Sequence, residues 1–288
     1  MPARLTVYPP DQPARQFLLD PERGCLIGRG PDCDLHIEDS RLSRRHARLA
    51  VNDGCWRFGD LGSKNGTMLA GRAPGETALQ NGDWISFGGL LGQFADLSDA
   101  ELAADERRAH ARREDTISRS RQLDQQAGVD ALLQQVLRSL MELAGAQRGF
   151  VMLAGSDRQL AVRAHAGGVD PATAGRDFPG SRGALARVMH ACAPVVVCDT
   201  SADTMLGAQP SIVSGQIRAL VCLPLVIGGQ ITGLVYLDSS RPGKVFSSLD
   251  VEILEAFAAH AALVIAAASV REELADVAAG AVPASAPS

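Results

Sequence analysis

The feature that most constrains the fold is a change of pattern near residue 98. From Arg4 to about Leu97 the chain consists of apolar runs of four to eight residues, separated by turn residues such as Asn-Asp-Gly and Gly-Ser. No helical period in this part lasts longer than about one turn, so it predicts an all-β sandwich. Beyond the linker that follows, helical periods and strand-like runs alternate, which predicts an α+β domain with an antiparallel sheet flanked by helices.

A length of 288 residues suits about two domains. We expect the sandwich over residues 1–98, a charged helical linker over 99–127, the α+β domain over 128–272 and a disordered Ala/Pro/Ser-rich tail over 273–288. Within the second domain, apolar spacing predicts a helix over 129–144 and a long closing helix capped by Ser247 or Ser248. Gly228-Gly229 marks the turn of a hairpin between them.

Composition excludes several classes of protein. The net charge is −5 and aromatic residues make up 4%, so we expect no direct nucleic-acid binding. No run approaches the roughly 20 apolar residues of a membrane span, and the N-terminus lacks a secretion signal, so we expect a cytoplasmic protein. The six cysteines form no CxxC pair, no metal site is expected, and no P-loop, HExxH, GxSxG or kinase motif is present. We therefore expect no enzyme activity.

Basic residues gather in one short segment. The chain has 26 arginines and only two lysines, yet Arg41, Arg44, Arg45 and Arg48 fall within eight residues, and Lys64 follows in a glycine-flanked turn. Such loops between strands are where binding residues concentrate. A dianionic phosphate needs guanidinium forks, hydroxyls and amide N–H groups that converge from different loops. The cluster therefore indicates an anion site for a phosphorylated side chain.

Individual residues suit parts of that task. Ser43 can donate a hydroxyl hydrogen bond, Arg29 can supply a planar fork, and Arg44 and Lys64 add charge. Asn65 has an amide that can pair with the backbone of an extended peptide. Gly66 after it permits the backbone conformation that directs the amide outward.

The order of these motifs resembles the forkhead-associated (FHA) domain: Gly-Arg at 28–29, Ser-Arg-Arg-His at 43–46 and Asn-Gly-Thr at 65–67. The resemblance covers about residues 4–98 and implies an eleven-stranded β-sandwich that binds phosphothreonine peptides. It implies phosphopeptide contacts at Arg29, Ser43, Arg44, Lys64 and Asn65, and it places Arg41 where an acidic residue after the phosphothreonine would be read. It gives structural roles to Gly28, His46 and Gly66. Some sandwiches of this kind bind partners without phosphate, and that alternative stays open.

The second domain resembles a GAF domain over about residues 128–270. The resemblance implies a sensor with a pocket on one face of its sheet, and dimerisation through the first and last helices. Phe246 and Asp250 match part of a cyclic-nucleotide motif, but Ser240-Arg241 stands where Asn-Lys is expected, and packing and helix capping explain the pair equally well. His165, His190, Cys192 and Cys198 are open to the same structural explanation. We predict no cofactor, and the GAF ligand is unknown.

Two functions follow from these observations. The first is a non-catalytic adaptor that recognises phosphothreonine-containing products of a Ser/Thr kinase pathway and forms homodimers through the GAF helices. The alternative is a ligand-responsive GAF sensor, for a cyclic nucleotide or another small molecule, whose FHA domain makes phosphate-independent contacts. Thr116 in the arginine-flanked linker is a possible phosphorylation site that would compete for the FHA site.

Overall fold

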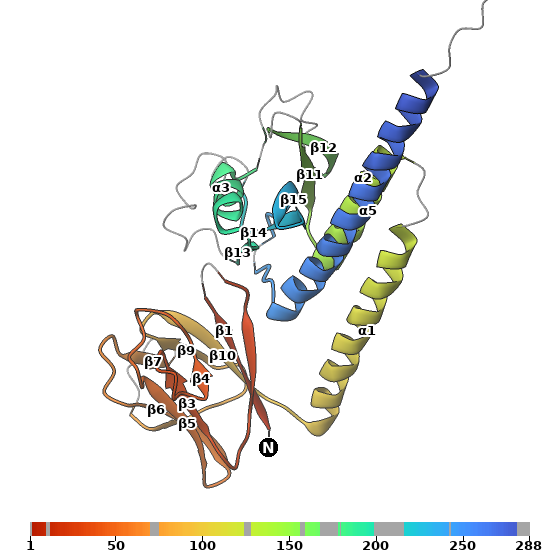
Figure 1. Ribbon diagram of the computed structural model, residues 1–288. Coiled ribbons are helices and arrows are strands. Elements are labelled where there is room, and N and C mark those ends of the chain that lie inside the picture. Colours follow the sequence, from red (N-terminus) through yellow and green to blue (C-terminus); the bar gives the residue numbers. More distant parts are fainter. Residues whose placement is uncertain are drawn as a thin grey trace, which may run out of the picture. The chain divides into compact units, whose positions relative to one another are not determined.

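The computed structural model describes residues 2–9, 12–69, 75–123, 128–155, 159–167, 178, 180–198, 216–241 and 243–280. The chain divides into two compact units, Met1–His110 and Ala111–Ser288. Figure 1 shows the strands of the first unit in red and orange, and the sheet and helices of the second in green and blue.

The first unit is a β-sandwich of two five-stranded sheets, with the strand orders β2-β1-β10-β9-β7 and β4-β3-β5-β6-β8. The predicted all-β fold is confirmed, with ten strands among the described residues instead of the eleven that the resemblance implies; residues 70–74 lie outside the described part. The strands are β1 (Ala3–Tyr8), β2 (Arg15–Leu19), β3 (Cys25–Gly28), β4 (Leu35–His36), β5 (Ala47–Asn52), β6 (Cys55–Asp60), β7 (Thr67–Leu69), β8 (Thr77–Ala78), β9 (Trp84–Phe87) and β10 (Leu90–Asp96).

The core of the sandwich comes from the inward-facing residues of both sheets. In β1, Leu5 and Val7 are fully buried and alternate with residues of the opposite face, as expected for a strand with one covered side. Phe58 of β6 and Phe87 of β9 meet edge to face with ring centroids 5.5 Å apart. Each such buried side chain contributes about 1.5–3 kcal/mol through the hydrophobic effect. This core fixes the strand ends from which the binding loops start.

The second unit contains one antiparallel sheet with the strand order β12-β11-β15-β14-β13. The expected α+β fold is confirmed, and the hairpin of β14 and β15 turns at Gly228-Gly229 as predicted. Its elements are α2 (Val129–Ala144), β11 (Arg148–Ala154), β12 (Leu160–Ala166), α3 (Arg182–Ala191), β13 (Val195–Val197), β14 (Ala219–Ile227), β15 (Gln230–Ser239) and α5 (Ser248–Gly280).

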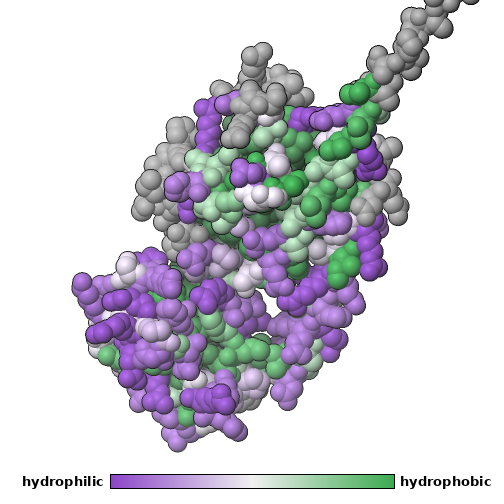
Figure 2. Space-filling view, viewed as in Figure 1, coloured by the Kyte–Doolittle hydropathy of each residue, from purple (hydrophilic) through white to green (hydrophobic). Residues whose placement is uncertain are grey.

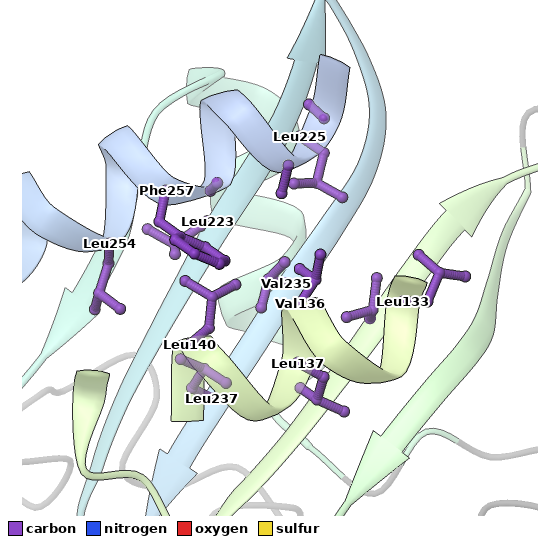
Figure 3. Packing of buried hydrophobic residues seen from close by; sticks show 14 of the residues in the cluster. Leu133, Val136, Leu137, Leu140, Leu223, Leu225, Val235, Leu237, Leu254 and Phe257 are labelled. Carbon is purple, nitrogen blue, oxygen red and sulfur yellow. The ribbon is translucent and has the colours of Figure 1, made fainter. Parts of the chain in front are cut away.

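Helices α2 and α5 pack on one face of this sheet. Figure 3 shows Leu140 of α2 and Phe257 of α5 pointing toward Leu223 of β14 and Leu237 of β15, and all four side chains are fully buried. The apolar spacing that predicts both helices is therefore the spacing of their sheet-facing side.

The opposite face of the sheet carries a second apolar cluster with α3. Phe178 lies there with its ring centroid 5.2 Å from that of Phe150 and 5.1 Å from that of Tyr236. The Tyr236 hydroxyl, fully buried, accepts a hydrogen bond of 3.2 Å from the Ser181 N–H. Phe178 thus packs on the face of the sheet opposite α2 and α5.

Helix α5 begins with a capping box. The Ser247 hydroxyl accepts from the Asp250 N–H at 3.2 Å, and the Asp250 carboxylate accepts from the Ser247 N–H at 2.6 Å, which makes Ser247 the N-cap. The helix continues to Gly280, so residues 273–280 are helical instead of disordered as expected. Alanine, leucine and glutamate in this stretch are strong helix formers, which explains the extension. Residues 281–288 lie outside the described part.

The apolar stretch Ser248–Ala275 of α5 is long enough to span a membrane by length and composition, contrary to the expectation that no run approaches that length. Half of it is buried in the core of the second unit, as for the core helix of a soluble domain. The cytoplasmic location stays a prediction.

The predicted helical linker is α1 (Asp99–Leu123), and residues 124–127 lie outside the described part. Its later part belongs to the second unit and is attached there by ion pairs. Arg113 lies 3.2 Å from Glu252 of α5, Arg112 pairs with Asp250, and Arg119 pairs with Glu142 of α2. The charges that indicated a solvated helix therefore also hold it against α2 and α5.

Candidate functional site

The basic and polar residues of the predicted anion site lie on three loops of the first unit. One loop follows β3, the second precedes β5, and the third joins β6 to β7. Two backbone hydrogen bonds join the first two loops, from the Arg29 N–H to the Ser43 carbonyl at 3.0 Å and from the Gly30 N–H to the Arg44 carbonyl at 2.9 Å. Residues far apart in the sequence are thereby held in one surface.

Gly28 allows the first two loops to approach this closely. A Cβ atom at this position would lie 2.3 Å from the Arg44 carbonyl oxygen and 2.9 Å from the Ser43 carbonyl oxygen. Both contacts are far inside van der Waals distance, and backbone atoms cannot move aside cheaply. The structural role predicted for Gly28 is therefore close packing under the loop that carries Ser43 and Arg44.

His46 joins the second loop to the third. It is fully buried, its Nδ1 accepts a hydrogen bond of 3.0 Å from the Ser43 N–H, and its Nε2 lies 3.2 Å from the Gly66 carbonyl oxygen. Because Nδ1 accepts, the ring proton of neutral His46 is on Nε2 and is donated to Gly66. The ring is buried below the site, where it connects the two loops, and it does not face solvent.

The Ser43 hydroxyl links the same two loops at the surface. Its Oγ accepts a hydrogen bond of 3.0 Å from the Lys64 N–H, which leaves its own hydrogen available for an outside acceptor. The third loop is supported from below by Asp60, whose carboxylate accepts from the Ser63 N–H at 2.7 Å and the Ser63 hydroxyl at 2.6 Å. Burial opposes ionisation of Asp60, but these hydrogen bonds outweigh it and lower the pKa of its carboxyl.

Asn65 lies at the exposed end of the third loop. Its Nδ2 donates a hydrogen bond of 2.8 Å to the Arg41 carbonyl, which fixes the orientation of the side-chain amide. Gly66 follows with φ +71°, a conformation that residues with a side chain rarely adopt, so its predicted role is that of a turn residue. Within the described residues, the Asn65 Oδ1 accepts no hydrogen bond, so it can receive one from a peptide N–H.

Three residues with cationic side chains adjoin Ser43 through the backbone: Arg29 and Lys64 by hydrogen bonds and Arg44 as its neighbour in sequence. Arg29, Arg44 and Lys64 are exposed, and their charged groups form no hydrogen bond or ion pair with any residue that the structure describes. In contrast, Arg148 and Arg163 pair with Asp238 and Asp130. Three cationic residues on the loops that hold a donor hydroxyl suit the three acceptor oxygens and double negative charge of a phosphoryl group.

Arg41 has an acidic neighbour in its own loop, and its predicted role in reading an acidic residue stays a prediction. Its guanidinium is paired with Asp39, with Nη2 2.6 Å from Oδ2 and Nε 3.0 Å from Oδ1. The hydrogen bonds from Arg41 outweigh partial burial and lower the pKa of the Asp39 carboxyl. An acidic peptide side chain would have to compete with Asp39 for this guanidinium.

Asp39 and Asp60 are the site residues that sequence reasoning missed. Asp39 precedes Arg41 by two residues and accepts its N–H at 2.9 Å, while Asp60 precedes Ser63 by three. At both spacings an aspartate carboxylate commonly accepts a hydrogen bond from a backbone N–H two or three residues later and so stabilises a turn. This spacing is the sequence signal that could have identified both residues.

Thr116, the possible phosphorylation site, belongs to the second unit. It lies in α1 with 6% of its surface exposed, and its hydroxyl donates a hydrogen bond of 2.8 Å to the Arg112 carbonyl. A kinase would reach it only after this part of α1 separates from its neighbours. Modification of Thr116 stays a prediction.

Comparison with known families decides the identity of both units. A model of the FHA domain family matches residues 25–88, which include all three site loops, and a model of the GAF domain family matches residues 128–265. The chain carries an FHA domain followed by a GAF domain. Both matched ranges lie within the expected domains, 1–98 and 128–272.

The FHA domain is shared with curated bacterial regulators. The chain is 39% identical over 73 residues to the oxoglutarate dehydrogenase inhibitor of Corynebacterium efficiens, a match that covers 25% of this chain and 51% of that protein. The chain thus spans about half the length of the curated relatives it matches.

Solved structures of both domain types match parts of the chain. The FHA domain of the CT664 protein from Chlamydia trachomatis is 28% identical, with a TM-score of 0.32 and coverage of 34% of this chain and 100% of that one. The GAF domain of a phosphoenolpyruvate-protein phosphotransferase from Coxiella burnetii is 15% identical, with a TM-score of 0.48 and coverage of 57% and 98%.

Phe246 and Asp250, which match part of a cyclic-nucleotide motif, make packing and capping contacts in the GAF domain. Phe246 is fully buried in the core below α5, with the Lys244 Nζ 4.8 Å from its ring centroid, and Asp250 caps α5 and pairs with Arg112. Within the described residues, no group of three or more His, Cys, Asp or Glu side chains is placed to hold a metal ion.

Proposed function

We propose that this protein is a non-catalytic signalling adaptor whose FHA domain binds phosphothreonine-containing segments of partner proteins and whose GAF domain joins two copies of the chain. One observation carries the first half of this proposal. The Ser43 hydroxyl accepts from the Lys64 N–H and keeps its hydrogen, while the cations of Arg29, Arg44 and Lys64 have no acidic partner in the described part of the chain.

The chemistry of the site supports recognition without reaction. It offers donors and positive charge from three loops, which suits binding of a phosphoryl group. The Asn65 amide, oriented by Arg41, can hold the backbone of the segment that carries the phosphate. The curated relatives are regulators by name, which agrees with a protein that acts by binding others. The partner would be the product of a Ser/Thr kinase, and the expected compartment is the cytoplasm.

The second half of the proposal depends on α5. Exposed apolar residues lie on one stripe of its later part: Leu263 (60% exposed), Val270 (54%), Leu274 (64%) and Val277 (69%). The spacings of seven, four and three residues are those of the contact seam between two paired helices. Figure 2 shows green apolar atoms along this end of the helix. Two joined copies would bind a partner with two phosphorylated segments more tightly through effective concentration.

Fluorescence polarisation of the full chain tests phosphate recognition. The probes are degenerate peptides centred on phosphothreonine, phosphoserine or threonine, each with a fluorescent label. We expect saturable binding of the phosphothreonine pool and little binding of the threonine pool. Equal binding of both pools would overturn the proposal and favour phosphate-independent contacts.

A further inference from the structure

The outward side of the second sheet of the FHA domain holds a hollow of about 400 Å³ beside the candidate phosphate site. Its lining includes Arg48 of β5, Arg57 of β6 and Glu76 just before β8. A solvent-facing sheet surface is usually filled by its own side chains, so the hollow needs an explanation in the sequence of β5 and β6.

The pairing of the two strands explains the hollow. In the register of β5 and β6, Arg48 lies opposite Gly59 and Arg57 lies opposite Ala50. Each arginine therefore faces a residue with a small side chain or none, and the two arginines are diagonal neighbours on the same face of the sheet. Gly59 and Ala50 form the bottom of the hollow, and the two long basic side chains stand on either side of it.

The acidic groups in the hollow accept hydrogen bonds from neighbouring residues, whereas its basic groups donate none to the residues that the structure describes. Both carboxylate oxygens of Asp60 accept hydrogen bonds from Ser63, and Oε1 of Glu76 accepts from the Asn52 Nδ2 at 3.1 Å. In contrast, the guanidinium groups of Arg48 and Arg57 form no hydrogen bond or ion pair with any part of the chain that the structure describes. The unmet hydrogen-bonding capacity of the hollow therefore suits an anionic ligand.

The third loop of the candidate phosphate site begins at the hollow. Asp60 and Leu61 line the hollow, and from there the same loop runs on to Lys64 beside the Ser43 hydroxyl. The Leu61 N–H also donates a hydrogen bond of 3.0 Å to the carbonyl of His46, the residue whose ring connects two loops of that site. Counted from the residues at the Ser43 hydroxyl, Asp60 is four residues from Lys64 and Arg48 is five from Ser43. At about 3.3 Å per extended residue, a bound peptide would span that stretch in roughly four to six residues at most.

We propose that Arg48 and Arg57 bind a carboxylate-rich segment of the same partner protein, four to six residues away from the phosphothreonine. This rests on the proposed phosphothreonine recognition and adds a requirement on the partner's sequence. Arg41, the residue expected to read an acidic side chain, is paired with Asp39, whereas Arg48 and Arg57 have no such pair among the described residues.

The test uses the full chain and four labelled peptides of one alanine-rich sequence. One has phosphothreonine with three glutamates four to six residues after it, the second has them before it, and the third has glutamines in both places. The fourth has the glutamates but unmodified threonine. The variants are Arg48→Gln with Arg57→Gln, and the matched control is Arg23→Gln, an exposed arginine of the same domain that is outside the hollow.

We expect one glutamate peptide to bind about three- to tenfold more tightly than the glutamine peptide, as two exposed charge pairs allow. The gain should vanish in the double variant and persist in Arg23→Gln. No gain, or an equal loss in the control, would overturn the role of the hollow while phosphate-dependent binding remained. A glutamate gain without any effect of the phosphate would support the hollow and contradict the phosphothreonine proposal. Failure of every peptide to bind would count against both.

Discussion

The backbone N–H of Lys64 donates a hydrogen bond of 3.0 Å to the Oγ of Ser43, across 21 residues of sequence. Beneath this bond, the His46 ring joins the same two loops through Ser43 and Gly66. The surface that we propose for phosphate recognition is therefore held from above and below by side chain–backbone hydrogen bonds. Changes in these supports should alter binding without touching a residue that contacts the ligand.

Replacement of His46 tests the lower support. His46→Ala leaves the Ser43 N–H and the Gly66 carbonyl without their partner and opens a cavity, so we expect a loss of about 2–4 kcal/mol in the free energy of unfolding. Both tryptophans, Trp56 and Trp84, lie in the FHA domain, so urea unfolding followed by tryptophan fluorescence reports this domain alone. The exposed His190, in the GAF domain, is the control. A loss below 0.5 kcal/mol would contradict the role given to His46.

Gly28→Ala tests the close approach of the first two loops. The added Cβ would lie 2.3 Å from the Arg44 carbonyl oxygen, so we expect a loss of about 2–3 kcal/mol in unfolding free energy and weaker phosphopeptide binding. Gly59→Ala is the matched control, because its Cβ would meet no atom closer than 4.0 Å. If both variants unfold at the same urea concentration, the packing argument fails.

Asp60 predicts a dependence of FHA stability on pH. The pKa of its carboxyl is lower in the folded chain than its ordinary value of 3.8, so its stabilisation is present above that value and is lost as the pH falls through the folded-state pKa. We expect Asp60→Asn to cost about 1 kcal/mol at pH 7 and progressively less below pH 3.8. Urea unfolding at pH 7, 4 and 3 measures this, with Asp32→Asn as an exposed control. A difference that stays constant down to pH 3 would rule out the hydrogen-bonded carboxylate as its cause.

The stripe on α5 predicts a homodimer. Light scattering after gel filtration should give twice the chain mass of 30.3 kDa for the unmodified protein. Val270→Glu with Leu274→Glu places charges in the stripe and should shift the mass toward one chain. Ala275→Glu, exposed but beside the stripe, should leave the dimer intact. A monomer before any substitution would contradict the proposed dimerisation.

The fold could be predicted from apolar spacing because local periodicity records which face of each element is buried. The turn at Gly228-Gly229 and the Ser247 cap depend on neighbouring residues only, and both are found as predicted. The continuation of α5 to Gly280 was not predicted. The disorder expected over 273–288 was inferred from the Ala/Pro/Ser content of that whole stretch, although its prolines come only after Gly280.

The candidate site was only partly predictable, for a physical reason. Residue type and order indicate which side chains can bind phosphate, but not which of them are already paired. Asp39 engages Arg41 within one loop, whereas the lack of partners of Arg48 and Arg57 among the described residues depends on the pairing of β5 with β6. The same holds for the buried pair of Arg148 and Asp238, 2.6 Å apart across β11 and β15.

The central claim is that Arg29 and its neighbours bind a phosphoryl group, and one comparison tests it most directly. Binding of the phosphothreonine pool and the threonine pool is measured for the unmodified chain, Arg29→Ala and the control Arg23→Ala. We predict that Arg29→Ala weakens phosphothreonine binding at least tenfold, because a charge-assisted pair is lost, and that Arg23→Ala does not. Unchanged phosphothreonine binding in Arg29→Ala, with the FHA domain still folded by its tryptophan fluorescence, would contradict the account.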